Sequence, residues 1–210
     1  MVDLAVVAFA TGCIAGATNL AGFAWSVRVP ERRYWPPGER DWRYYAQWTV
    51  AQTVTVSMAA TAFLDWNSLG LPRPLSLYAG LALFVPGFAG ALAAGRNLGS
   101  AETSGLLGDL QTDSWYRFSR NPQYVCYAVA TVGFALVANS TLAAGLSVVQ
   151  FAIWLALPFP EEPWLSEQYG DAYDEYRERV PRFVGVHTLR ELVGLVARDR
   201  DAGDATTPDR

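Results

Sequence analysis

Five stretches of the chain are apolar enough and long enough to cross a bilayer as helices. They cover about residues 4–25, 45–66, 75–94, 122–138 and 141–160. A helix needs about 20 apolar residues to span roughly 30 Å of hydrocarbon. Lipid offers no hydrogen-bonding partner to bare backbone groups, so each span must satisfy its own. The pattern therefore predicts an all-α polytopic membrane protein with about five transmembrane helices.

The individual spans suggest how the helices pack. The second carries several polar side chains, among them Gln47 and Gln52, so we expect one of its sides to face protein rather than lipid. The third is rich in glycine and alanine, which permits close approach of a neighbouring helix. Only Asn139 and Ser140 separate the last two spans. This short link predicts a tight antiparallel hairpin.

The arginines are divided unequally between the two sides of the predicted bundle. The chain has 16 arginines and no lysine, and fifteen of them lie in the segments 26–44, 95–121 and 161–210. The opposite side holds only Arg73. Positive charge collects on the cytoplasmic side of membrane proteins. The arginines therefore predict an external N-terminus and a cytoplasmic C-terminal segment.

Composition agrees with a membrane protein and narrows the function. Charged residues make up 17% of the chain and apolar residues 51%, whereas roughly 25% of a soluble domain is charged. A net charge of -4 argues against a nucleic-acid partner. His187 is the only histidine, which excludes a multi-histidine metal cluster. We therefore expect the bilayer as a partner, and neither nucleic acid nor metal.

Two polar, aromatic stretches adjoin the final hairpin and are the candidates for chemistry. They cover residues 110–124 and 161–183. Because the hairpin is antiparallel, its two cytoplasmic ends must lie together. Arg120 is therefore expected near Glu161 and Glu162, although about forty residues separate them along the chain.

The two ends of the hairpin have different expected roles. Pro122 suits the first turn of a helix, whose free N–H groups favour an anion. Adjacent glutamates cannot point the same way on a helix, so we expect one of Glu161 and Glu162 to face a site and the other solvent. Arg120 has two interpretations that the residues leave open: a functional group, or an ion pair with a glutamate that fixes the hairpin end.

The spacing of these motifs resembles a known family of membrane enzymes. Arg120-Asn121-Pro122-x-Tyr124 is followed, after two spans' worth of chain, by Glu161-Glu162-x-x-Leu165 and the ending Val180-Pro181-Arg182-Phe183. This combination resembles the isoprenylcysteine carboxyl methyltransferase and phospholipid methyltransferase family of integral membrane methyltransferases. The likeness covers roughly residues 95–183.

The resemblance implies an S-adenosylmethionine site at the cytoplasmic end of the hairpin, enclosed by the C-terminal segment. The acceptor it implies is membrane-resident or hydrophobic: an isoprenylcysteine-like carboxylate, a phospholipid amine or a small thiol. Glu161 and Arg120 are the implied catalytic pair. Glu161 would bind the amino group of the cofactor, and Arg120 or backbone N–H groups would hold its carboxylate. The implied cofactor-binding residues are Arg120, Asn121, Pro122, Tyr124, Cys126, Glu161, Glu162, Leu165 and Tyr169.

Two other functions stay open at this stage. Some membrane sterol reductases have a similar C-terminal hairpin that binds a nicotinamide cofactor. A non-catalytic membrane protein of the same fold is the other alternative. It gains weight because Asn121 stands where many family members have histidine, and Cys126 where they usually have glycine.

The domain prediction follows from the same patterns. Residues 1–185 form the transmembrane methyltransferase domain, 186–198 a short interfacial helix, and 199–210 a disordered acidic tail. Tyr173 and Tyr176 share a helix face with Tyr169. We expect the first two to be aromatic anchors at the membrane surface, and Tyr169 to pack over the site.

Overall fold

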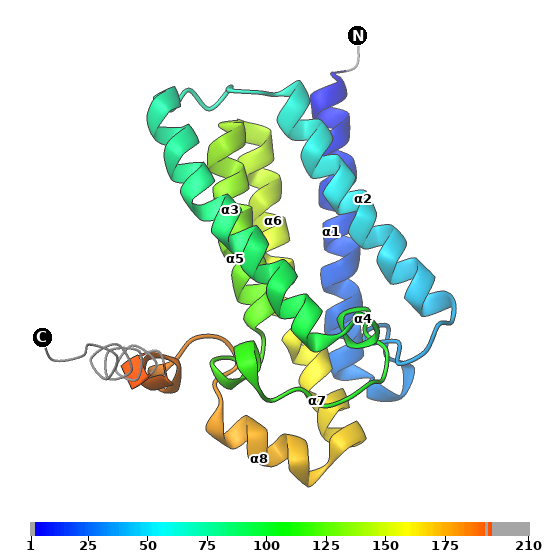
Figure 1. The fold of residues 1–210 in the computed structure, drawn as a ribbon. Coiled ribbons are helices and arrows are strands. Elements are labelled where there is room, and N and C mark those ends of the chain that lie inside the picture. The colour runs from blue at the N-terminus through cyan, green and yellow to red at the C-terminus, as the bar shows by residue number, and fades with distance from the viewer. Residues whose placement is uncertain (1–2, 192, 195–210) are drawn as a thin grey trace, which may run out of the picture.

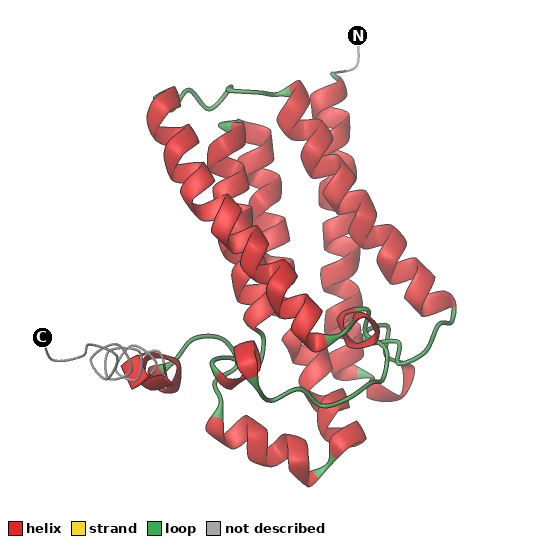
Figure 2. Cartoon of the chain, in the orientation of Figure 1, coloured by secondary structure: helices red, strands yellow, loops and turns green. Residues whose placement is uncertain are grey.

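The computed structural model describes residues 3–191 and 193–194. Five long helices run side by side (Figure 1): α1 (Leu4–Arg28), α2 (Trp42–Leu64), α3 (Arg73–Leu98), α5 (Pro122–Ala138) and α6 (Thr141–Ala156). The shorter elements are η1 (Pro30–Arg32), α4 (Ser100–Thr103), η2 (Ser114–Arg117), α7 (Pro158–Tyr169) and α8 (Asp171–Arg179). Figure 2 shows helices and connecting loops throughout the described part of the chain, as the sequence predicted.

The surface and lengths of the long helices are those of an integral membrane protein. α1, α3 and the continuous stretch Thr141–Tyr169 are long and apolar enough to cross a membrane, and α5 is apolar but shorter. Large apolar side chains cover the outside, with Phe63 81% and Ile14 69% exposed. A soluble monomer rarely exposes such an extended apolar surface. The polar side chains of α2 set it apart, so its crossing of the membrane stays a prediction.

The five long helices pack in a defined order. α3 lies along α5, α1 lies along α2, and α6 contacts both α5 and α1. The main core cluster joins α1, α2 and α6 through Phe23, Val54 and Leu146. At the hairpin turn, Asn139 adopts a left-handed conformation with φ of 50°, and the Ser140 hydroxyl accepts a hydrogen bond from the Ala143 N–H. The predicted α5–α6 hairpin is confirmed.

The α3–α5 contact depends on glycine. A Cβ atom built on Gly133 of α5 would lie 2.3 Å from the backbone nitrogen of Phe84, and one built on Gly80 of α3 would lie 2.7 Å from that of Val137. Both distances are too short for carbon, and the obstructing atoms are backbone. The two helices therefore approach as closely as glycine permits, as expected from the composition of the third span.

Gly133→Ala should separate α3 from α5 and destabilise the protein. Forcing a methyl group into a packed interface typically costs about 1–3 kcal/mol. The measurement is thermal unfolding in detergent, where we expect a clear fall in Tm. Gly194→Ala is the control, because a Cβ atom at Gly194 meets nothing within 4 Å. Equal Tm values for the two variants would contradict the close α3–α5 contact.

The arginine-rich segments gather at one end of the bundle. The loop before α2, the segment from α4 to η2, and helices α7 and α8 all lie at the lower end in Figure 1, opposite the N-terminus. Residues 186–191 and 193–194 are helical, and Val186 and Leu189 are exposed there. The rest of the predicted interfacial helix, and the whole predicted tail at 199–210, lie outside the described residues.

Candidate active site

The two ends of the α5–α6 hairpin meet at the arginine-rich end. Pro122 begins α5, and α6 continues through Leu157, itself in a helical conformation, into α7. This arrangement brings Arg120 to Glu162, with 2.9 Å between the guanidinium Nη2 and the carboxylate Oε1. The predicted proximity across about forty residues is therefore confirmed.

Glu162 is the centre of a buried ionic cluster. Its Oε1 accepts hydrogen bonds from Arg120 and from Arg182 Nε, and its Oε2 accepts one from Arg182 Nη2 at 2.6 Å. The hydrogen bonds to Glu162 raise the pKa of the Arg182 guanidinium. Glu162 is only 4% exposed. The expectation that one glutamate of the pair faces solvent is therefore wrong, because the second glutamate turns toward two arginines.

Arg120 belongs to the same ionic cluster. Besides its bonds to Glu162, its Nη1 donates to the backbone oxygens of Arg177 (2.7 Å) and Val180 (2.8 Å). A guanidinium has five N–H groups, so one is left for a ligand. These contacts fit the alternative in which Arg120 pairs with a glutamate and fixes the hairpin end. Binding of a cofactor carboxylate by Arg120 stays a prediction.

Glu161 points elsewhere, into a cavity beside the cluster. Its Oε1 accepts hydrogen bonds from the Tyr124 hydroxyl and from the indole Nε1 of Trp35, both at 2.6 Å. Its Oε2 has no hydrogen bond to any described residue. The two adjacent glutamates thus have separate surroundings. Glu162 links α7 to Arg120 and Arg182 by ion pairs, and Glu161 presents a carboxylate oxygen to the cavity.

Trp35 is a site residue that the sequence pattern did not predict. The Ser26 hydroxyl of α1 accepts hydrogen bonds from the backbone N–H groups of Tyr34 and Trp35, which turns this loop inward. A Cβ on Gly105 would lie 2.4 Å from the Trp35 ring. The arginine pattern places the loop on the correct side of the membrane, but nothing local in the sequence indicates which partner the indole contacts.

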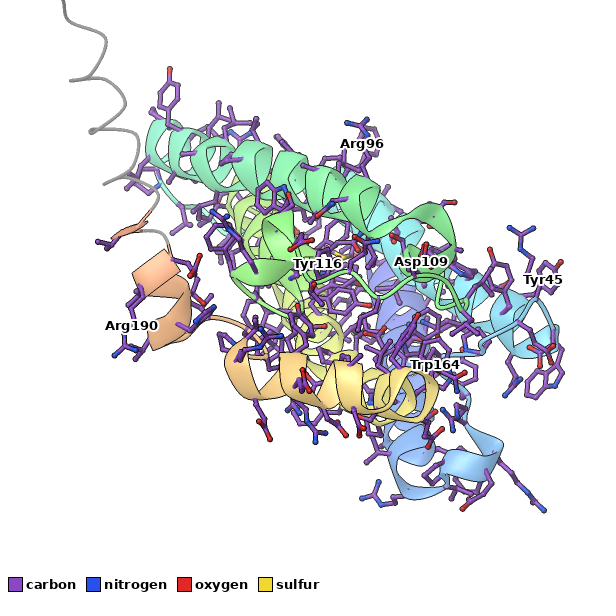
Figure 3. The ribbon with its side chains drawn as sticks, turned by 60° about the horizontal axis from the view of Figure 1, so that its bottom comes forward. Tyr45, Arg96, Asp109, Tyr116, Trp164 and Arg190 are labelled. Atoms are coloured by element: carbon purple, nitrogen blue, oxygen red, sulfur yellow. The ribbon has the colours of Figure 1, made fainter. Side chains whose placement is uncertain are left out.

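The cavity beside Glu161 lies between α7, α8, the start of α5 and the segment from α4 to η2. Figure 3 looks onto this end, where Tyr116, Asp109 and Trp164 lie around the space between α3 and the α7–α8 pair. Six of the predicted cofactor residues are among those that line it: Arg120, Asn121, Tyr124, Glu161, Leu165 and Tyr169. The main additions are Leu98, Glu102, Asp109, Gln111, Tyr116, Trp164 and Tyr173.

Three of the predicted cofactor residues do not line this cavity. Pro122 is buried at the start of α5, and Glu162 is in the ionic cluster. Cys126 faces α3, where its Sγ would lie 2.9 Å from a Cβ built on Gly90. The next turns of α5 therefore pack against α3 instead of surrounding the cavity.

The tyrosines after Glu161 close the cavity rather than anchor the protein in the membrane surface. Tyr173 and Tyr176 are 2% and 3% exposed. The Tyr176 hydroxyl donates to the backbone oxygen of Tyr116 (2.7 Å), and the Tyr169 hydroxyl donates to that of Gly108 (2.8 Å). Burial raises the pKa of the Tyr173 hydroxyl and that of the Tyr176 hydroxyl well above the ordinary value for tyrosine. The expected interfacial role for these two residues is therefore wrong.

A second, larger cavity lies inside the helix bundle. It has a volume of about 460 Å³ and is bounded by residues of α1, α2, α3, α5 and α6. Tyr124 and Gln123 line both cavities. The first turn of α5 is therefore the wall between a polar space at the arginine-rich end and an aromatic, mostly apolar space within the bundle.

The fold and the surface define an all-α integral membrane protein with a polar cavity at one end. Residues 75–172 match the family model described as phospholipid methyltransferase. This match confirms the family resemblance seen in the motifs, and it implies methyltransferase activity in a membrane. It extends from the first turn of α3 to the first residues of α8. No curated protein and no solved structure matches the chain.

Proposed function

We propose that the protein transfers a methyl group from S-adenosylmethionine to a membrane-resident, hydrophobic acceptor. The observation that carries this proposal is the wall shared by the two cavities. Tyr124 lines both, and its hydroxyl is bonded to the Glu161 carboxylate. A water-soluble donor and a lipid-soluble acceptor can therefore reach one place from opposite sides.

The residues of the polar cavity suit a cationic donor. Three carboxylates are among its lining residues, Glu102, Asp109 and Glu161. The one arginine of the lining, Arg120, is already paired with Glu162. The donor carries a sulfonium and an ammonium group, so Glu161 Oε2 is placed to accept a charge-assisted hydrogen bond from the latter. The Trp164 and Tyr169 rings offer flat apolar surfaces to a planar base.

Donor binding must widen this cavity. Its enclosed volume is about 90 Å³, whereas pockets for drug-sized ligands hold about 300–1,000 Å³. The segment 105–111 forms one side of the cavity, and its displacement would widen it. It is held to the rest of the site by the Tyr169–Gly108 hydrogen bond and by the backbone bonds of Gly38 to Gly105 and Leu107.

The chain's own residues would align the reactants and exclude water. The donor supplies an activated methyl group on a positively charged sulfur. Glu161 would hold the donor at the wall, while the buried aromatic residues keep water from the reacting centre. Alignment of two bound reactants accounts for much of the rate of such a displacement.

The arginine-rich end is the proposed cytoplasmic side. Fifteen of the 16 arginines belong to segments of that end by sequence, and Arg73 alone belongs to the other. The donor is made in the cytoplasm, so this orientation gives the polar cavity access to it. The N-terminus would then be external.

Transfer of label tests the proposal. Membranes containing the protein are incubated with S-adenosylmethionine labelled in the methyl group, then separated into lipid, protein and water-soluble fractions. We expect label in the organic extract only when the protein is present. Label confined to water-soluble products, with folded protein in the membranes, would contradict a membrane-resident acceptor.

A further inference from the structure

The larger cavity, inside the helix bundle, contains buried polar groups that have no hydrogen-bond partner among the described residues. Asn19 of α1 and Gln47 of α2 line it and are 1% and 5% exposed. The carbonyl oxygen of each side chain, and the indole Nε1 of Trp48, have no hydrogen-bond partner among the described residues. Unpaired polar atoms are costly in a low-dielectric interior. All three residues line the same cavity, so a ligand bound there is the nearest candidate partner for these atoms.

The same cavity offers no charged partner. None of its lining residues is aspartate, glutamate, lysine, arginine or histidine. A carboxylate or phosphate placed there would lack a counter-ion, and so would an ammonium group. Two carbonyl acceptors and one N–H donor instead suit a group that is uncharged and both donates and accepts. A hydroxyl group has these properties.

Three of the aromatic side chains that line the cavity form a stack. Trp154 lies nearly parallel to Tyr127, with ring centroids 4.7 Å apart, and to Tyr124, with centroids 6.0 Å apart. These three rings therefore offer one flat aromatic surface to a ligand. Such a surface favours a flat or hydrocarbon body over an alkylammonium head group.

A hydrophobic molecule can enter this cavity between α2 and α3. Gln52 and Thr55 of α2 and Phe88 of α3 line the cavity and are exposed on the outside of the bundle. Helix α2 packs on α1 and α6, whereas α3 packs mainly on α5. The opening therefore faces the bilayer, from which an uncharged amphiphile would partition.

We infer that α1 and α2 form the recognition site for an uncharged, hydroxyl-bearing hydrophobic molecule, an alcohol or a phenol, through Asn19, Gln47 and Trp48. The inference rests on the proposed function, in which this molecule is the methyl acceptor. These three residues precede the segment that matches the family model, 75–172. Acceptor choice is thus set by a part of the chain outside the matched methyltransferase segment.

The residues at the wall between the two cavities can accept the proton that is released when a methyl group is transferred to a hydroxyl group. The hydroxyl oxygen forms a bond to the methyl carbon as the sulfur–carbon bond breaks, and that bond's electron pair stays on sulfur. The hydroxyl proton passes to the Tyr124 oxygen while Tyr124 gives its own proton to Glu161, along the 2.6 Å hydrogen bond between them. The products are a methyl ether, a neutral thioether and a protonated Glu161.

Equilibrium binding of radiolabelled 4-nonylphenol tests the inference without the donor. Full-length protein is placed in phosphatidylcholine nanodiscs, and uptake by empty nanodiscs is subtracted. We expect saturable binding that unlabelled 4-nonylphenol displaces, whereas 4-nonylbenzoate and phosphatidylethanolamine do not at tenfold excess. Stronger displacement by the benzoate or by phosphatidylethanolamine would overturn an uncharged hydroxyl as the recognised group.

Near-isosteric variants assign the binding to the polar residues. Asn19→Leu and Gln47→Met should each weaken 4-nonylphenol binding about tenfold. Thr61→Val is the matched control, because Thr61 is buried and unpaired but does not line the cavity. Unchanged binding in both cavity variants would overturn the inference. Donor binding is measured separately: phenol binding without donor binding refutes the proposed function alone, and the converse refutes this inference alone.

Discussion

Replacing Glu162 by glutamine should destabilise the protein more than any other single change at the site. The carboxylate is 4% exposed and forms ion pairs with the largely buried Arg120 and with Arg182, whose side chain is 35% exposed. Removing one member of a buried ion pair typically costs about 3–5 kcal/mol, because the remaining charge stays buried. Thermal unfolding in detergent should show a large fall in Tm. The segment after α8 should also become sensitive to protease, because Arg120 anchors the backbone of residues 177–181.

Glu167→Gln is the matched control for this cluster. Glu167 also lies on α7 and pairs with an arginine, Arg33, but its side chain is 47% exposed. Exposed ion pairs contribute about 0–1 kcal/mol, so this variant should unfold close to the wild type. If Glu162→Gln unfolded at the same temperature as Glu167→Gln, the buried cluster would not be what holds the C-terminal segment.

Glu161→Gln should leave the fold intact and weaken donor binding. The glutamine oxygen can still accept the hydrogen bonds from Trp35 and Tyr124, so the local structure has a replacement for Glu161 Oε1. The lost interaction is the charge-assisted bond to the ammonium group, worth about 1.5–3 kcal/mol. That loss corresponds to an increase in Kd of roughly 10- to 150-fold.

Calorimetric titration with S-adenosylmethionine measures this effect, with Tm recorded for the same samples. Glu167→Gln again serves as control, since it removes a carboxylate from the same helix outside the cavity. A Glu161→Gln protein that is folded and binds the donor as tightly as the wild type would remove Glu161 from the proposed site.

The arrangement of the hairpin could be predicted because it depends on topology alone. The antiparallel link at Asn139 and Ser140 determines which ends meet, whatever the side chains do. The contact of Arg120 with the glutamates follows from it. Local pattern also predicted that α3 would approach a neighbouring helix closely, because the third span is rich in glycine and alanine.

The direction of each side chain could not be predicted in the same way. Adjacent residues point about 100° apart on a helix of 3.6 residues per turn, so one of Glu161 and Glu162 had to leave the cavity. Which one left depends on how α7 continues from α6 through Leu157. The glutamate that points away from the cavity was expected to face solvent. Instead, the chain after α8 folds back and places Arg182 beside it.

Contacts between distant segments account for the other differences. Trp35 reaches Glu161 only because Ser26 turns its loop inward and Gly105 leaves room for the indole. Tyr173 and Tyr176 have the spacing of a surface anchor, and the same spacing serves a buried face once η2 covers them. A helical period shows which residues share a face, and packing decides what that face contacts.

The measurement that tests the central claim most directly is a thermal-stability titration of the purified protein with S-adenosylmethionine and, in parallel, with NADPH. A ligand at about 100 times its Kd stabilises the folded protein by about 2.7 kcal/mol. We predict a saturable rise in Tm with S-adenosylmethionine and none with NADPH. No rise with S-adenosylmethionine in folded protein, or a rise with NADPH instead, would contradict the proposed methyltransferase.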